Sequence, residues 1–251
     1  MTIEEQSSDG DLGQQQQAIQ DYDEAIRLKP DDAVAYNDRG IIYGTLGQYQ
    51  RAIQDFTEAI RLIPDYAKAY FNRGLAYYNL GEFGQQQRAI QDFTEAIRLK
   101  PDFFNAFYHR GLAYSNLSQY QRAIQDYDEA IRLKSDDTEA YNNRGSAYGN
   151  LSLYQQAIQD FNETIRLKPD YADAYYNRGT ASGLLGQHQR AIQDFNEAIR
   201  LKPDYADAYN NRGLSNLREG HNDLGCHDLQ KACELGDCKG FEWAKDNGFF
   251  G

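Results

Sequence analysis

Apolar residues recur along this chain at spacings of three and four, the period of an α-helix with one buried face. The spacing is clear in two neighbouring runs, which are Tyr36, Gly40 and Tyr43, then Ala52, Ile53, Phe56, Ala59 and Ile60. Residues 46–49 supply a turn between the runs, and Pro64 ends the second run because proline cannot continue the helical hydrogen-bond ladder. The pattern therefore predicts a hairpin of two helices.

This hairpin recurs through most of the chain. The string Tyr-x-Asn-Arg-Gly, with small variations, places its glycine at Gly40, Gly74, Gly111, Gly145, Gly179 and Gly213. The spacing is constant except between Gly74 and Gly111, where three residues are added. The string Ala-Ile-Gln-Asp-Phe/Tyr begins at Ala18, Ala52, Ala89, Ala123, Ala157 and Ala191. One hairpin buries too little apolar surface to be stable alone, whereas stacked copies share a continuous core, so the repeats predict a solenoid.

The repeated residues resemble the tetratricopeptide repeat family. The family pattern is Trp-x-x-Leu-Gly-x-x-Tyr, then Ala-x-x-x-Phe, then Pro. This chain has Tyr36-x-x-Arg39-Gly40-x-x-Tyr43, Ala52-x-x-x-Phe56 and Pro64, and the resemblance extends over about residues 15–235. It implies an all-α fold, a right-handed α-solenoid of stacked antiparallel helix hairpins that forms the tetratricopeptide superhelix.

The same register sets the expected organisation of the chain. Five complete units are predicted at 33–66, 67–103, 104–137, 138–171 and 172–205, the second with three added residues in its inter-helix turn. Residues 13–32 match a second helix alone, and 206–236 form a degenerate sixth unit. We expect residues 1–12 to be a disordered tail, and residues 237–251 to form a capping helix and tail.

Arginine replaces the leucine of the family pattern in six units. These residues are Arg39, Arg73, Arg110, Arg144, Arg178 and Arg212. An unpaired charge on a packed face costs several kcal/mol, so each arginine needs a partner. The aspartates that recur in the second helices, Asp55, Asp92, Asp126, Asp160 and Asp194, supply one in a constant register. We predict repeated Arg–Asp pairs between helices; the alternative is that each arginine extends to solvent.

The resemblance also implies that the first helix of each hairpin lines the concave, partner-binding face. Two residues before each motif glycine stand Asp38, Asn72, His109, Asn143, Asn177 and Asn211. An amide carries a donor and an acceptor, so a row of asparagines can pair with the main chain of an extended peptide. Such a row is similar to the asparagine ladder in the repeats of the O-linked N-acetylglucosamine transferase. The alternative is that these amides bind only water.

Flanking positions on the same face are candidates for specificity. Apolar and aromatic contacts are predicted at Phe71, Tyr78, Tyr108, Tyr176, Leu75 and Leu112. Each tyrosine has an alternative role as filler of a tyrosine-rich repeat. Six residues before the glycine the series becomes acidic, at Glu139, Asp173 and Asp207. This trend favours a neutral or basic partner segment, and its alternative is a solvated acidic face.

Charge and composition exclude several classes of partner. The chain has 26 basic and 38 acidic side chains, a formal charge of -12, which disfavours nucleic acid and anionic membranes. No stretch approaches the roughly 18 apolar residues of a membrane span, and the first eight residues lack the pattern of a signal peptide. The sequence therefore predicts a cytoplasmic protein.

Catalytic and metal-binding patterns are missing from the sequence. The four histidines share no register, and no glycine-rich phosphate loop occurs, so we expect neither enzyme activity nor a cofactor. Cys226 and Cys233 are two helical turns apart, roughly 10 Å, which is too far for a disulfide. Cys233 and Cys238 could close across a turn. Buried packing, a redox-sensitive disulfide and a metal site all remain open for this cluster.

Three functions fit these patterns. The first is a protein-interaction scaffold that binds an extended peptide on the concave face. The second is a structural protein that forms homo-oligomers by stacking its terminal helices, and the third is a non-catalytic regulatory subunit of an enzyme complex.

Overall fold

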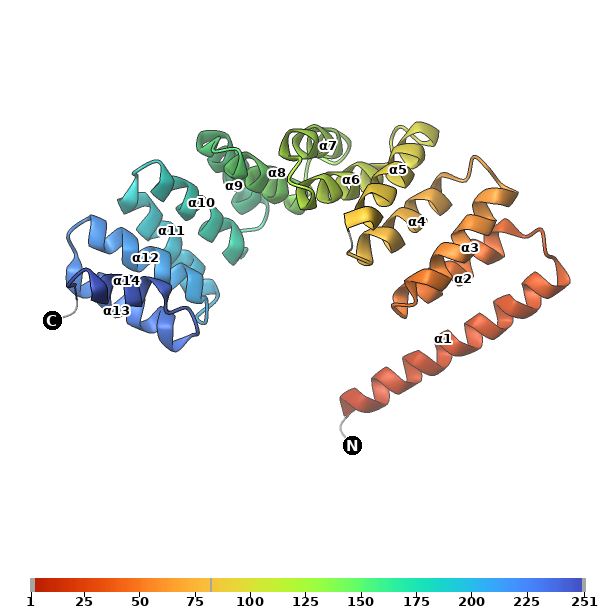
Figure 1. Ribbon diagram of the computed structural model, residues 1–251, viewed down its shortest axis with the longest axis horizontal. Coiled ribbons are helices and arrows are strands. Elements are labelled where there is room, and N and C mark those ends of the chain that lie inside the picture. The colour runs from red at the N-terminus through yellow and green to blue at the C-terminus, as the bar shows by residue number, and fades with distance from the viewer. Residues whose placement is uncertain (1–2, 82, 250–251) are drawn as a thin grey trace. The chain divides into compact units, whose positions relative to one another are not determined.

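The computed structural model describes residues 3–81 and 83–249, and all regular elements within these ranges are α-helices. The chain divides into two compact units, Met1–Leu133 and Lys134–Gly251. The boundary lies beside Ser135, which stands where the neighbouring units have Pro101 and Pro169. Figure 1 shows that both units consist of antiparallel helical hairpins, which confirms the all-α fold class.

Unit 1 contains three hairpins and one preceding helix. Its helices are α1 (Ile3–Leu28), α2 (Ala33–Thr45), α3 (Tyr49–Leu62), α4 (Ala67–Asn79), α5 (Phe83–Leu99), α6 (Phe104–Asn116) and α7 (Tyr120–Leu133). The hairpins are α2/α3, α4/α5 and α6/α7, and each second helix also packs on the next first helix within the unit. Consecutive first helices are in contact, α2 with α4 and α4 with α6. This stacking gives the unit a continuous core.

Unit 2 repeats the arrangement and ends in a short helix. Its helices are α8 (Thr138–Asn150), α9 (Tyr154–Leu167), α10 (Ala172–Leu184), α11 (His188–Leu201), α12 (Ala206–Arg218), α13 (Asn222–Glu234) and α14 (Lys239–Asp246). First helix α10 contacts both α8 and α12. Helix α14 packs on α12 and α13, beside the last hairpin (Figure 1).

The motif glycines allow the two helices of each hairpin to approach closely. In α8, a Cβ atom added at Gly145 would lie 2.8 Å from Cε1 of Phe161 on α9. The same contact with an aromatic ring, at 2.7 to 2.8 Å, recurs at Gly40, Gly74, Gly111 and Gly179, and at Gly213 the nearest atom is Cγ of Leu229 at 2.9 Å. The ring of Phe161 is buried, and Ala157 one turn earlier is fully buried. Any side chain at Gly145 would therefore displace the aromatic ring that fills the hairpin core.

Helix α8 carries a second glycine that makes a matched comparison possible. A Cβ added at Gly149 has no atom within 4 Å. We expect Gly145→Ala to lower the free energy of unfolding by about 1–3 kcal/mol because it overpacks the core. Gly149→Ala should raise it by up to about 0.5–1 kcal/mol, since alanine has the higher helix propensity. Urea denaturation followed by circular dichroism measures both, and effects of equal sign would contradict this account of the motif glycines.

The predicted Arg–Asp pairs are confirmed in all five complete units. In a representative pair, Arg178 Nε and Nη2 donate to Asp194 Oδ2 and Oδ1 at 3.0 and 2.6 Å, joining α10 to α11. The degenerate sixth unit also forms the pair, between Arg212 and Asp228. The signal for that pair was present in the sequence, because Asp228 follows Asp194 by one repeat length.

The remaining guanidinium nitrogen links neighbouring hairpins. Arg178 Nη1 donates to Asn162 Oδ1 at 2.8 Å, and Asn162 belongs to α9 of the preceding hairpin. In unit 1, Arg73 and Arg110 make the corresponding bonds to Thr57 and Thr94. Each of these arginines therefore bonds to both second helices that flank its own first helix.

The structure differs from the sequence expectation at two places. Disorder is predicted for residues 1–12. In the structure α1 begins at Ile3, and residues 1 and 2 lie outside the described residues. Once a helix is nucleated, each added residue gains a hydrogen bond at little cost. The three extra residues of the 67–103 unit extend α5 to 17 residues, against 14 in α3, and do not lengthen the turn. Helix α4 ends at Asn79 and α5 begins at Phe83, and the corresponding helix ends of the preceding hairpin are Thr45 and Tyr49.

The cysteines lie near the end of unit 2. Cys233 and Cys238 form a disulfide across the turn between α13 and α14. Cys226 is a free, half-buried thiol that donates to the carbonyl oxygen of Phe249 at 3.1 Å.

Within the described residues, no three His, Cys, Asp or Glu side chains are grouped as a metal site would need. No helix in the described ranges has the length and apolar character of a membrane span.

Candidate binding face

The first helices of each unit form one face of the hairpin stack, called here the first-helix face: α2, α4 and α6 in unit 1, and α8, α10 and α12 in unit 2. Three cavities open between consecutive first helices. The α2–α4 cavity has a volume of about 230 Å³, the α8–α10 cavity about 320 Å³ and the α10–α12 cavity about 190 Å³. Each cavity is therefore a repeated feature of the face and belongs to one unit.

All three cavities use the same register positions. Counted from the motif glycine, the first hairpin supplies positions +4, +5, +9 and +16, and the next first helix supplies -2, +1, +2 and +5. Position +16 is the core aromatic ring, Phe56, Phe161 or Phe195, which forms the base. Position +4 is glycine in each case, at Gly44, Gly149 and Gly183. The missing side chain at +4 leaves room for the cavity.

A tyrosine stands at the +4 position in the 67–103 unit. The ring centroid of Tyr78 lies 6.4 Å from that of His109 on the next first helix. The Tyr78 hydroxyl accepts a hydrogen bond from Asn116 Nδ2 at 3.2 Å. Tyr78, predicted as a contact for a partner, thus bridges α4 and α6 at the place where glycine opens a cavity in other units.

The asparagine row joins neighbouring first helices. Asn72 Nδ2 donates to Asn37 Oδ1 at 3.0 Å, and Asn177 Nδ2 donates to Asn142 Oδ1 at 3.3 Å. Asn211 Nδ2 donates to the hydroxyl of Tyr176 at 3.2 Å. The acceptor always stands three residues before the motif glycine of the preceding unit. Each amide therefore uses part of its hydrogen-bonding capacity within the fold, and Asn143 occupies the same register on α8.

His109 breaks the row and points into an aromatic cluster. Its ring centroid lies 5.2 to 6.1 Å from those of Tyr108, Phe71 and Phe93. Its Nδ1 atom is buried without a hydrogen-bond partner among the described residues. Burial lowers the pKa of His109 to about 4, so the imidazole is neutral at pH 7. Phe71 is itself buried, and both residues serve the core of unit 1 in this structure.

The other predicted apolar contacts remain partly exposed. Leu75 lines the α2–α4 cavity, and Leu112 occupies the same +1 position one unit later. Tyr108 packs between His109 and the buried ring of Tyr127. Tyr176 packs on Phe195 and Tyr205, and burial raises the pKa of its hydroxyl. These four residues are therefore all half-buried and keep part of their surface exposed.

The acidic series lies at the N-terminal ends of the first helices of unit 2. Glu139, Asp173 and Asp207 are exposed and stand in the first turns of α8, α10 and α12, where the helix dipole favours negative charge. Glu139 accepts a hydrogen bond from the hydroxyl of Tyr171 at 2.9 Å. Burial and a hydrogen bond to Asp173 raise the pKa of Tyr205. Helix stabilisation therefore accounts for part of this series.

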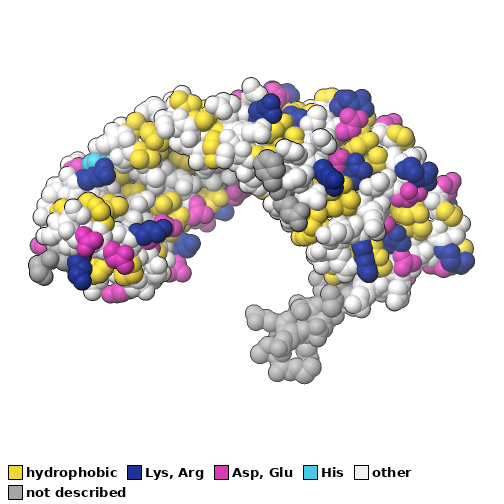
Figure 2. All heavy atoms as spheres, in the orientation of Figure 1, with side chains coloured by type: hydrophobic (Ala, Val, Ile, Leu, Met, Phe, Trp, Pro, Cys, Tyr) yellow, Lys and Arg dark blue, Asp and Glu magenta, His cyan; other side chains and the backbone are white. Residues whose placement is uncertain are grey.

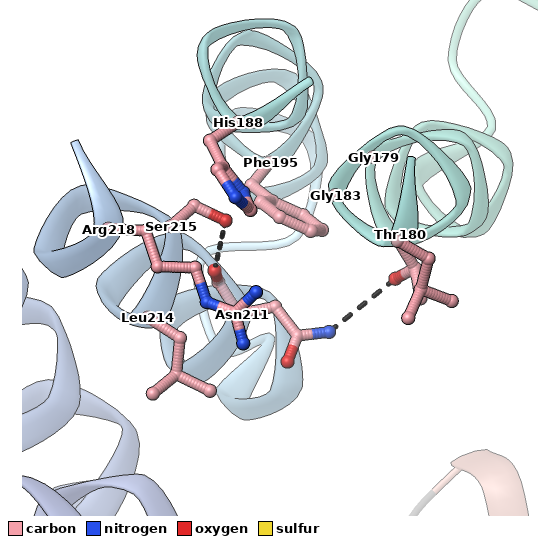
Figure 3. A pocket seen from close by; sticks show the side chains of 10 residues that line it. Gly179, Thr180, Gly183, His188, Phe195, Asn211, Leu214, Ser215 and Arg218 are labelled. Atoms are coloured by element: carbon pink, nitrogen blue, oxygen red, sulfur yellow. Dashed lines mark hydrogen bonds between the residues drawn. The ribbon is translucent and has the colours of Figure 1, made fainter. Parts of the chain in front are cut away.

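The α10–α12 cavity differs from the other two in its polar groups. Figure 3 shows His188 and Phe195 on one side, Thr180 and Gly183 on α10, and Asn211 and Arg218 on α12. Asn211 Nδ2 lies 3.5 Å from Thr180 Oγ1. The Nδ1 atom of His188 is buried and has no hydrogen-bond partner among the described residues. This cavity combines an apolar base with basic side chains.

Two features of this face were missed by reasoning from the sequence. The +4 glycines were not recognised as openings, although Gly44, Gly149 and Gly183 recur in one register. The sequence also did not identify the residue at position +9 on the second helix, which is Tyr49, Tyr154 or His188, as part of the cavity wall. Charged side chains do not single out a face, because Figure 2 shows basic and acidic groups interspersed on the visible surface.

Comparisons with known proteins agree with this repeat register. A TPR repeat model matches residues 11–47, 45–81, 82–118 and 184–220. Two tetratricopeptide repeat models match residues 104–137 and 138–171, and residues 161–193. A search of curated protein sequences gave no match.

Solved structures with the same fold include YrrB, described as a TPR protein with an unusual peptide-binding site. YrrB is 25% identical, with a TM-score of 0.67, over 74% of this chain and 95% of YrrB. MamA is 27% identical, with a TM-score of 0.59, over 65% of this chain and 92% of MamA. A tetratricopeptide repeat protein from Parabacteroides merdae is 24% identical, with a TM-score of 0.65, over 97% and 94% of the two chains.

Proposed function

Because the chain belongs to the tetratricopeptide repeat family, we propose that it is a non-catalytic scaffold that binds an extended segment of a partner protein on its first-helix face. The observation that supports this most is the recurrence of one cavity, in one register, between α2 and α4, α8 and α10, and α10 and α12. A repeated opening fits a repeated contact with an extended chain.

The +4 glycines support the same proposal through their energetic cost. Glycine within a helix costs roughly 0.5–1 kcal/mol relative to alanine. Gly44 and Gly149 have open space where a Cβ would lie, so packing does not require glycine at either position. A role in keeping the cavities open gives these residues a reason to be glycine. YrrB, of similar fold, is described as having a peptide-binding site.

Filling the cavities tests the proposal. Peptides selected from a random 12-residue phage-display library on the full chain should bind a Gly44→Tyr, Gly149→Tyr and Gly183→Tyr variant at least tenfold more weakly. Tyrosine is tolerated at this register, as Tyr78 shows. Fluorescence anisotropy with the synthesised peptides gives the Kd values.

The matched control places three tyrosines on exposed positions of second helices, in a Gln54→Tyr, Gln125→Tyr and Gln159→Tyr variant. It should bind the same peptides within twofold of the unmodified chain. Equal loss of peptide affinity in both variants, or no loss in either, would contradict binding on the first-helix face. Cavity filling is cleaner than Asn177→Ala or Asn211→Ala, because those amides also join neighbouring helices.

Self-assembly through the terminal helices is a second candidate function. Trp243 on α14 is 48% exposed and stacks on Phe249, beside a cavity of about 460 Å³ between α12 and α14. At the other end, Leu28 of α1 is 70% exposed. Light scattering over a hundredfold concentration range separates the two candidates. We expect a constant mass of 28.7 kDa, and a mass that rises with concentration would favour assembly.

A further inference from the structure

We propose that the two cavities of unit 2 together recognise a short extended motif in which an apolar and an acidic side chain stand three residues apart. The inference rests on the proposed function and specifies the chemistry of the partner. It follows from the different lining of two cavities that share one register, from an arginine with no ion-pair partner among the described residues, and from the spacing of the first helices.

The α8–α10 cavity is suited to an apolar side chain. Its base is the buried ring of Phe161, and its walls include Tyr154 and Leu184. Leu184 is 60% exposed, although it lies at the rim of both cavities. An apolar side chain placed here would remove the exposed surface of Leu184 from water, which favours binding by about 25 cal/mol for each Å² buried. The occupant of this cavity is therefore aliphatic or aromatic.

The α10–α12 cavity has basic groups at the equivalent positions. His188 stands where the α8–α10 cavity has Tyr154, and Arg218 stands where it has Leu184. The six arginines of the motif register all form carboxylate pairs, whereas the side chain of Arg218 has no ion pair or hydrogen bond to a described residue. A guanidinium binds a carboxylate through two parallel hydrogen bonds. The charge of this cavity complements an acidic side chain.

The acidic series does not oppose this assignment. Arg218 is the last residue of α12 and Asp207 is the second, so the two are eleven positions apart along the helix. At 1.5 Å per residue the separation along the axis is roughly 16 Å, about twice the screening length at physiological salt. A partner can therefore carry an acidic group at Arg218 and neutral or basic groups near Asp207.

The spacing of the cavities sets the spacing of the motif. Helix α10 contacts both α8 and α12, and packed helices lie roughly 8–10 Å apart. In a polyproline II segment, side chains three residues apart point the same way and are separated by about 9 Å. In a β-strand the same-face spacings are about 7 and 13 Å, which fit the helices less well. An extended segment of polyproline II form with side chains at i and i+3 matches both cavities.

The test uses four fluorescein-labelled ten-residue peptides with a proline-rich background, measured by fluorescence anisotropy on the full chain. Two carry leucine and glutamate three residues apart, one in each order. The third peptide has glutamine in place of glutamate. In the fourth peptide, leucine and glutamate stand two residues apart. One of the two ordered peptides should bind, and the glutamine and shortened peptides should each bind about tenfold more weakly. Lack of binding by both ordered peptides at about 1 mM would overturn the proposal.

Two variants assign the effect to the two cavities. Arg218→Gln should weaken the glutamate peptide about tenfold and leave the glutamine peptide unchanged, so the preference for glutamate disappears. Gly149→Tyr should weaken the leucine-containing peptides about tenfold, while Gly149→Ala, which fills less of the cavity, has a smaller effect. Equal weakening of the glutamate and glutamine peptides by Arg218→Gln would contradict recognition of a carboxylate. Urea denaturation of each variant verifies that it is folded.

The library peptides separate failure of this inference from failure of the proposed function. One outcome would overturn the motif but not the binding face. The selected peptides would bind the triple tyrosine variant more weakly, yet they would contain no apolar and acidic pair, and their affinity would not change in Arg218→Gln. If the selected peptides bind the triple tyrosine variant as tightly as the unmodified chain, both the binding face and the motif are overturned. Enrichment of the pair at a spacing of three, with loss of affinity in Arg218→Gln, would support the motif.

Discussion

Asp194→Ala is expected to lower the free energy of unfolding by about 3–5 kcal/mol, the largest effect we predict for a single substitution. Asp194 accepts two hydrogen bonds from Arg178, and the two side chains are only 6% and 18% exposed. Removing the carboxylate leaves a guanidinium in the hairpin interior without its counter-charge. Urea denaturation followed by circular dichroism measures the loss.

A double replacement distinguishes the stability that the intact pair contributes from the stability lost when one charge remains buried without its partner. Leucine occupies the arginine position in the family pattern. We therefore expect Arg178→Leu combined with Asp194→Ala to recover most of the stability lost in Asp194→Ala, since the stranded charge is gone. As a surface control, Glu197→Ala removes the partner of Arg200 in an exposed pair on α11 and should change stability little. A loss as large as that of Asp194→Ala in the control would contradict the role of burial.

The pairs also explain how arginine is accommodated where a leucine would suffice. Burial raises the pKa of Asp92 and Asp126 despite the hydrogen bonds from Arg73 and Arg110. Desolvation therefore offsets much of the attraction within a pair. What the arginine adds is a bond to the preceding hairpin, such as that of Arg110 to Thr94. The arginine thus couples neighbouring hairpins, which leucine at this position could not do by hydrogen bonding.

The fold could be predicted because its determinants are local and repeated. Gly145 lies beside Phe161, and the same approach of a glycine to an aromatic ring recurs in each of the five complete units. The Arg–Asp pairs followed from the cost of an unpaired charge. The three extra residues of the 67–103 unit lengthen α5 and not the turn, a distinction that sequence spacing alone does not make. In the longer α5, Gln86 is buried and donates to the carbonyl oxygen of Tyr78 at 3.0 Å.

The candidate site was less predictable because it consists of space rather than side chains. A row of asparagines is visible in the sequence, but the bond from Asn177 to Asn142 depends on how two first helices pack. His109 also stands two residues before its motif glycine, and its ring packs against Phe71 and Phe93 of the preceding hairpin. Comparing Gly149 with Tyr78 at position +4 would have indicated an opening in one unit and a filled site in another.

Acidification from pH 7 to pH 5 is expected to destabilise the chain by about 2 kcal/mol through His109 alone. The folded-state pKa of His109 is about 4, below the ordinary value of 6.5. A depressed pKa means that the unfolded chain binds the proton more tightly than the folded chain. The stability that the neutral imidazole contributes is therefore complete above pH 6.5 and is lost as the pH falls from 6.5 towards 4. At 1.36 kcal/mol per pKa unit, the loss approaches about 3 kcal/mol at pH 4.

The comparison that isolates His109 is with His109→Phe, which keeps an aromatic ring beside Phe71 and Phe93 and cannot be protonated. Carboxylates also titrate in this range, but they do so in both proteins, so the difference between the two pH profiles belongs to the imidazole. Free energies of unfolding from urea titrations at half-unit steps between pH 4 and 7.5 should diverge below pH 6.5. Parallel profiles would mean that the folded chain protonates His109 without cost, which requires the ring to reach solvent and the aromatic cluster to open.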